Sequence, residues 1–250
     1  MNWLKRASLI ILIFLIFLIS RIPAETVLSW AAPKGVRLGV VSGTIWHGKI
    51  SAFQYRQYTF ENIRWEVQLS RLLTGKAAAK VQIGSQRKPS GLYASGLVYY
   101  GFGGPGADGL TVRYPAKKMA PFVGRRLPFP MKVSATGSVT LKVKEYQFAK
   151  PFCETLIGQA RWDNATVAVP DMNLNLEKIE TKLKCDKGAV VASFDGKNKL
   201  GLEGDVVVQD RKKYQAKLFM KPASDMPQAL HQGLMFFGKP DSQGRYAINL

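Results

Sequence analysis

From residue 34 to the end of the chain, apolar residues recur mostly at every second position. Side chains alternate between the two faces of a β-strand, so this period is typical of strands with one buried and one solvated face. Gly, Pro, Asn and Asp separate the runs at roughly regular intervals, as expected of turns. The clearest runs lie at residues 36–40, 63–69, 131–143, 179–185, 190–194, 200–208 and 214–220. The sequence therefore predicts a mainly antiparallel β domain with a few short helices.

A loose repeat, in which a glycine leads into a strand, suggests how this sheet is shaped. The glycines of the repeat are Gly43, Gly137, Gly158 and Gly204. A glycine inside or at the start of a strand marks a bend or a close contact, and several at similar positions favour a curved sheet. We therefore expect an open half-barrel or a sandwich.

The N-terminus carries a short apolar run between basic residues. Lys5 and Arg6 precede an uncharged stretch at residues 7–20, and Arg21 follows it. As a helix this stretch would span about 21 Å, less than the roughly 30 Å of a bilayer core, but flanking basic side chains can extend that reach. A cleaved signal peptide has a similar pattern, although the segment after Arg21 lacks the Ala-x-Ala spacing of a cleavage site.

We expect the apolar run to form a single transmembrane helix that stays attached. The basic residues before it would then remain in the cytoplasm. The predicted organisation is a cytoplasmic stub at 1–6, an anchor at 7–23, a short linker at 24–33 and a periplasmic β domain at 34–250. The signal-peptide alternative also puts the β domain outside the cytoplasm.

The chain is strongly basic, with 36 Lys and Arg against 17 Asp and Glu and a formal net charge of +19. The basic residues are scattered and alternate with apolar ones, which puts most of them on solvated strand faces. Nucleic-acid binding is usually signalled by a clustered patch or stripe. An exported protein instead meets anionic lipid headgroups and acidic partners, so we expect no nucleic-acid partner.

The two cysteines, Cys153 and Cys185, are predicted to form a disulfide. A lone pair in an oxidising compartment usually bridges, and closing a loop of about 32 residues would stabilise the fold by roughly 3 to 4 kcal/mol. Two buried free thiols are the alternative. With two histidines, His47 and His231, the chain offers a poor zinc set, and we predict no metal and no cofactor.

No segment carries a catalytic motif in the required context. Ser42 and Gly43 lack the G-x-S-x-G spacing of a nucleophile elbow. Gly101, Gly103 and Gly106 have the spacing of a dinucleotide fingerprint, but the run leads into a strand, whereas such a site opens a helix. The sequence therefore indicates a protein that is not an enzyme and has no catalytic residues.

Three short motifs together resemble the protein N family of the bacterial type II secretion pathway. They are a Pro-Ala pair after the apolar run, a Gly-Thr-Leu-Trp-x-Gly element with isoleucine in place of leucine, and a tryptophan followed by Leu-Leu-x-Gly. The later pair of cysteines also fits the family. The matching positions are Pro23 and Ala24; Gly43, Thr44, Trp46 and Gly48; and Trp65, Leu72, Leu73 and Gly75.

The resemblance implies an accessory single-pass subunit in the bacterial inner membrane that supports export of folded proteins from the periplasm across the outer membrane. Its partners would be other subunits of the inner-membrane platform, with the outer-membrane channel and membrane lipids as further candidates. A tethered β domain without reaction chemistry also suits partner recognition by strand addition or charge complementarity.

A periplasmic lipid-binding or lipid-transport protein is the alternative. Curved sheets with an apolar inner face carry lipids in the lipopolysaccharide-transport and AsmA-like families, which this pattern also resembles. A continuous groove would favour that function, and a filled core would favour a scaffold. The predicted apolar lining is Trp65, Leu69, Val139, Leu141 and Val206.

Overall fold

A computed structural model describes residues 2–31, 35–56, 58–88, 91–119, 134–169, 172–210, 213–235 and 238–249. Its main feature is one sheet of 14 strands, in which every strand pairing is antiparallel. The first seven strands are β1 (Val36–Leu38), β2 (Val41–Gly43), β3 (His47–Tyr55), β4 (Tyr58–Val67), β5 (Ala77–Ile83), β6 (Tyr93–Gly101) and β7 (Gly104–Pro115). The last seven are β8 (Ser134–Gln147), β9 (Thr155–Val169), β10 (Met172–Asp186), β11 (Ala189–Asp195), β12 (Glu203–Val208), β13 (Tyr214–Met220) and β14 (Tyr246–Asn249).

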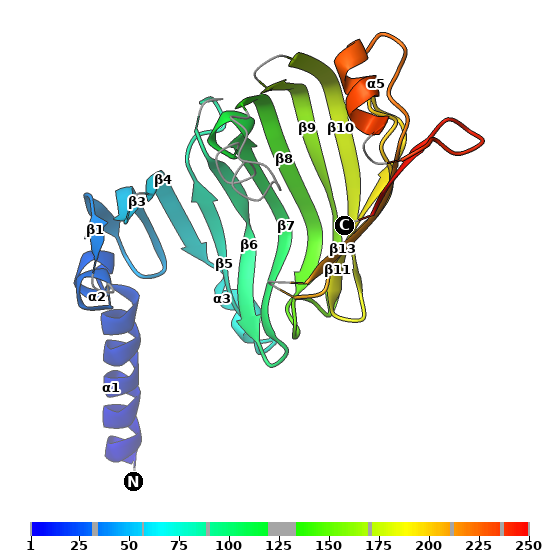
Figure 1. Cartoon of the computed structure of the whole chain (residues 1–250). Helices are drawn as coiled ribbons and strands as arrows, with labels where there is room; N and C mark the ends of the chain where they lie inside the picture. The colour runs from blue at the N-terminus through cyan, green and yellow to red at the C-terminus, as the bar shows by residue number, and fades with distance from the viewer. Residues whose placement is uncertain are drawn as a thin grey trace.

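The sheet is a meander with two open edges. From β3 to β14 each strand pairs with the next along the chain, whereas β1 and β2 both pair with β3. Sequential strands commonly become neighbours in this way because the connections stay short. The predicted antiparallel β domain is confirmed, as an open curved sheet (Figure 1). Met131 and Val133, at the start of one predicted strand, lie outside the described residues.

The predicted transmembrane helix was wrong. Helix α1 (Asn2–Ser20) covers the apolar run, but among the residues described no helix is both long and apolar enough to cross a membrane. Two of its early residues, Lys5 and Arg6, are charged. The helix ends at Ser20 and does not extend through residue 23, because Pro23 already pairs with Thr44 in an isolated β-bridge.

The other helices whose bounds the structure gives are short. Helix α2 (Ala24–Ala31) occupies most of the segment expected to be a linker, α3 (Leu69–Leu72) connects β4 to β5, and α5 (Gln228–Leu234) precedes β14. Figure 1 shows α5 at one end of the strands, beside β10.

Glycine and strand irregularities account for part of the curvature. Gly137 has a φ of +94°, and a Cβ at this position would overlap the carbonyl oxygen of Asp163. The register between β8 and β9 shifts at the same place, between Thr136 and Ser138. An irregularity of this kind bends a strand and increases its twist, so the glycine predicted to bend the sheet does so here.

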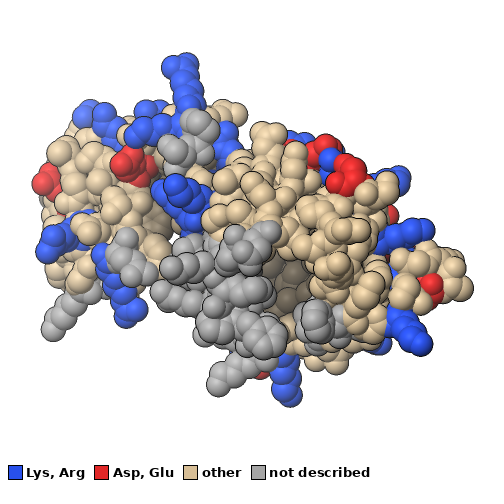
Figure 2. Space-filling view, turned by 45° about the horizontal axis from the view of Figure 1, so that its top comes forward, with Lys and Arg blue, Asp and Glu red and all other residues tan. Residues whose placement is uncertain are grey.

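The core consists of separate clusters along the sheet. One contains Leu174 and Leu176 of β10, Ala165 of β9 and Met226 before α5. In the view of Figure 2, Lys and Arg lie mainly along the outline of the molecule, and described uncharged residues border one side of a hollow. The sheet therefore offers distinct local surfaces.

Candidate functional site

The first two sequence motifs and Trp65 meet where the helical N-terminus contacts the first edge of the sheet. We call this group the motif junction. Its members come from the segment after α1, from the β2–β3 turn and from β4. They are Pro23, Ala24, Gly43, Thr44, Trp46, Gly48 and Trp65.

The β2–β3 turn is tight because two glycines face each other across it. Gly43 pairs with Gly48, and the backbone N–H of Thr44 donates to the carbonyl of His47 at 2.8 Å. Gly43 has a φ of +94°, in the left-handed region that favours glycine, and an added Cβ would overlap the carbonyl oxygen of His47. This geometry explains why the motif begins with glycine.

Trp46 joins the turn to the end of α1. Its indole N–H donates to the carbonyl of Ile19 at 2.9 Å. This carbonyl lies in the last turn of the helix, where the regular bond to a residue four positions later is missing, and it also accepts from the backbone N–H of Ile22 at 3.4 Å. The backbone N–H of Ile45 donates to the carbonyl of Ile22 at 3.2 Å. Ala24, which follows the β-bridge at Pro23, is only 1% exposed. The turn therefore fixes the N-terminal segment against the sheet.

Trp65 packs against the other side of the turn. Its indole N–H donates to the carbonyl of Ile45 at 3.0 Å. Its ring lies over Gly48, where a Cβ would overlap the ring carbons. A tryptophan on β4 and a glycine on β3 are thus a matched pair, and each motif supplies one partner.

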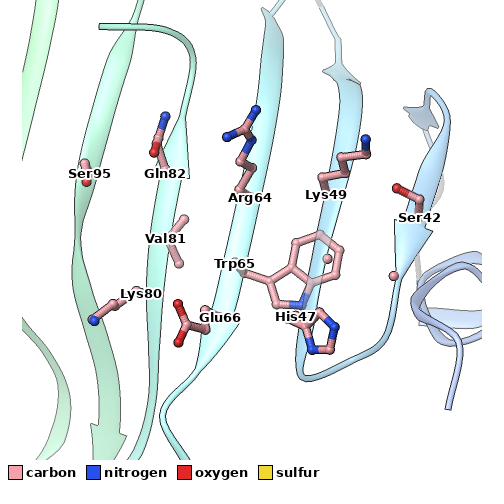
Figure 3. A pocket seen from close by; sticks show the side chains of 12 residues that line it. Ser42, His47, Lys49, Arg64, Trp65, Glu66, Lys80, Val81, Gln82 and Ser95 are labelled. Carbon is pink, nitrogen blue, oxygen red and sulfur yellow. The ribbon is translucent and has the colours of Figure 1, made fainter. Parts of the chain in front are cut away.

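An open groove of about 610 Å³ lies beside the junction, across β2 to β6 (Figure 3). Strand register places its polar side chains in two cross-strand rows, one on either side of the row that contains Trp65. The first row is Ser42, Lys49, Arg64, Gln82 and Ser95. The second row is His47, Glu66 and Lys80.

The groove has more positive than negative charge. Lys49, Arg64 and Lys80 line it together with one carboxylate, Glu66. Within the described part of the chain, none of these three cations takes part in a salt bridge. Cations without a protein counter-ion can pair with carboxylates of a partner. Sequence reasoning missed this group of cations because strand register cannot be read from alternation alone.

The Leu-Leu-x-Gly part of the third motif lies away from the motif junction. Leu72 ends α3 and is 48% exposed, and Leu73 is 91% exposed. Gly75 has a φ of +70° and lies against the ring of Phe102. Trp65 thus belongs to the junction, whereas the two leucines form part of an exposed surface at the end of β4.

The five predicted apolar lining residues are distributed over different environments. Val139 packs against Ala116 and Ala135, and Leu141 packs in the cluster that contains the disulfide. Leu69 lies on α3 and is 53% exposed, while Trp65 and Val206 are partly buried on β4 and β12.

The structure forms the predicted disulfide between Cys153 and Cys185, whose Cα atoms are 6.0 Å apart. Cys153 is 1% exposed and packs against Val143 and Leu156. The bond ties the segment before β9 to the end of β10.

Ionisable groups with shifted pKa values lie outside the groove. Burial raises the pKa of the phenol of Tyr99, with Asp108 adding to the effect, and burial also raises the pKa of Tyr146. Hydrogen bonds to Glu177 and Asp225 raise the pKa of Lys199, and the bond from Lys199 lowers the pKa of Asp225. In the part of the chain that the structure describes, no group of three or more His, Cys, Asp or Glu could hold a metal ion.

Comparisons with known proteins agree on one family. Residues 34–249 match the family described as Type II secretion system (T2SS), protein N. A relative named Type II secretion system protein N from Aeromonas hydrophila is 32% identical over 245 residues, which are 97% of this chain and 95% of the relative. A relative of the same name from Vibrio cholerae is 29% identical over 230 residues, covering 91% and 89%. No solved structure gives a significant match.

Proposed function

The chain belongs to the type II secretion system protein N family, and we propose that it serves as an accessory subunit that acts through contacts with other proteins of the machine. In this role it supports export of folded proteins from the periplasm across the outer membrane. The family assignment favours this function over the lipid carrier.

The proposal places residues 34–250 in the periplasm, next to the inner membrane. A disulfide that closes the β9–β10 region fits an oxidising compartment. The partners would be subunits of the inner-membrane platform, with the outer-membrane channel as a second contact.

The position of the motif junction carries the proposal. Trp46, Trp65 and the paired glycines fix the β2–β3 turn at the open first edge of the sheet. An edge strand exposes backbone groups that can pair with an added strand. The cations of the groove lie on the adjacent strands, so an acidic extended segment of a platform subunit could use both features.

Co-isolation from secreting cells tests the proposal. Full-length tagged protein, extracted in a mild detergent, should retain platform subunits that mass spectrometry identifies. The double variant Lys49→Glu and Arg64→Glu should retain less of them, because it reverses the charge of the groove.

The matched control is Lys182→Glu with Lys184→Glu, the same change in net charge on exposed positions of β10. It should behave as the unchanged protein does. Recovery of phospholipid without any secretion-system protein would contradict the proposed function.

A further inference from the structure

An exposed apolar surface lies at the end of the sheet that carries α3. We call it the apolar tip and define it by the following residues with their exposed fractions: Leu69 (53%), Leu72 (48%), Leu73 (91%), Tyr100 (66%) and Phe102 (100%). Single exposed apolar residues are common, but a group that protrudes from one end of a molecule usually marks a contact site.

The members of the tip come from the connection through α3 and from the end of β6 with the turn that follows it, and these two parts of the chain are neighbours. Ala77, at the start of β5, pairs with Tyr100 near the end of β6. Gly75 lies against the ring of Phe102, with 2.6 Å between an added Cβ and the ring. The connection through α3 and the β6–β7 turn therefore form one surface.

Two side chains of the tip protrude into solvent. Phe102 stands in a short turn between β6 and β7, with Gly101 before it and Gly103 after it, and it is fully exposed. Leu73 protrudes in a similar way just beyond α3. Protruding apolar side chains can enter the soft boundary between headgroups and acyl chains, where no matching protein pocket is needed.

The N-terminal helix emerges from the same end of the sheet. His47, after the turn that contacts α1, pairs with Glu66 next to the end of β4, and α3 follows directly. The exposed apolar side chains of α1, from Leu9 to Ile19, are 47–67% exposed. In Figure 1 the helix runs away from the sheet on the side where α3 and the β6–β7 turn lie. The apolar helix and the apolar tip thus lie toward the same end of the sheet.

Two basic residues lie next to the tip. Arg71 lies on α3, where it is 3.8 Å from Asp108 but keeps 44% of its side chain exposed, and Lys76 lies over the ring of Tyr99 at 4.6 Å. The whole chain carries a net charge of +19. Lysine and arginine next to an apolar surface favour anionic lipid headgroups.

We propose that the apolar tip is a lipid-contact surface, at which Leu73 and Phe102 enter the interface of a bilayer that contains anionic lipids. It goes beyond the proposed secretion function, because it concerns how the β domain is oriented on a membrane. The contact requires no helix to cross the bilayer. This lipid contact would hold the first edge of the sheet and the groove at a constant distance from the lipid surface.

Fluorescence of the full chain reconstituted with lipid vesicles tests this. Leu73→Cys and Phe102→Cys each introduce one labelling site for an environment-sensitive dye, while the two native cysteines stay paired. With vesicles of phosphatidylcholine and phosphatidylglycerol, emission at both positions should shift to shorter wavelength. Lipids spin-labelled in the upper acyl chain should quench it.

Tyr58→Cys is the matched control, because Tyr58 is a 40% exposed aromatic residue at the opposite end of β4. Its emission should not shift and should not be quenched. The proposal is overturned if Leu73 and Phe102 show no shift, or if Tyr58 shifts equally. A shift that needs membranes containing other secretion proteins, and is absent with pure lipid, would assign the tip to a protein partner and also overturn it.

Discussion

Among single residues, Gly48 and Trp65 form a pair in which a small residue makes room for a large one. The ring of Trp65 occupies the volume that a side chain at position 48 would need, and the indole N–H is satisfied by the carbonyl of Ile45. A large aromatic residue can pack this closely onto a backbone only where its neighbour has no Cβ.

Gly48→Ala should therefore destabilise the protein. The added methyl overlaps the Trp65 ring, and overpacking of this kind costs about 1 to 3 kcal/mol. Urea denaturation of the full chain, followed by tryptophan fluorescence, measures the loss. Gly233→Ala is the control, because nothing lies within 4 Å of an added Cβ there and the residue is helical. An equal effect of both substitutions would contradict this account of the glycine.

Trp46→Phe should release the end of α1 while keeping an aromatic ring. The substitution removes the hydrogen bond to the carbonyl of Ile19, which is worth about 1 kcal/mol, or about a fivefold change in local opening. Trypsin should then cleave the folded protein after Arg21 about fivefold faster.

Trp30→Phe provides the comparison, because Trp30 is 91% exposed on α2. Its cleavage rate after Arg21 should match that of the unchanged protein. If Trp46→Phe has no effect on that rate, the indole bond does not hold the helix end.

For helices and strands, the alternation of apolar and polar residues predicted where strands lie, but it did not predict which strands pair with one another. The run at 63–69 falls largely within β4, but its last residue, Leu69, begins α3 because the sheet ends at Val67. The run at 200–208 begins too early, since Gly201 has a φ of +54° and β12 starts only at Glu203. Local pattern reports which residues prefer to be buried, whereas these boundaries depend on tertiary contacts.

The motifs of the candidate site could be recognised in the sequence, but the contacts that bring them together could not be predicted. The Gly-Thr-x-Trp-x-Gly element is visible in the sequence, but its contact with Ile19 is a tertiary hydrogen bond across 27 positions. The row of Lys49, Arg64 and Gln82 exists only because three strands pair in one register. The prediction that the apolar run crosses a membrane rested on its composition. The end of the helix at Ser20 could not be predicted in this way, because it depends on the contact of Pro23 with Thr44.

The disulfide joins the segment before β9 to the end of β10 and should stabilise the fold. Replacing both cysteines, Cys153→Ser with Cys185→Ser, opens a loop with a sequence separation of 32. The chain-entropy relation gives a loss of roughly 3 to 4 kcal/mol in the free energy of unfolding. Thermal denaturation with and without dithiothreitol checks this, and the double variant should be insensitive to reductant. An unchanged melting temperature for the native protein after complete reduction would remove the stabilising role.

The whole molecule is an open sheet whose two edges differ. The last edge is the four-residue strand β14, which within the described ranges pairs with the end of β13 and with no other strand. The first edge is divided into β1 and β2 at Gly39 and Val40, and it lies beside the motif junction and the groove. Short or interrupted edges limit uncontrolled association while leaving a defined place for a partner.

Site-specific photo-crosslinking in secreting cells shows whether the first edge of the sheet contacts other proteins of the secretion machine. Val40 is 75% exposed at the first edge, and a photoreactive residue in its place should form adducts with a subunit of the type II secretion machine. The same residue at Lys182, on the central strand β10, should form few or none. Absence of protein adducts from Val40, or adducts with lipid alone, would contradict the claim that this chain works through protein contacts at that edge.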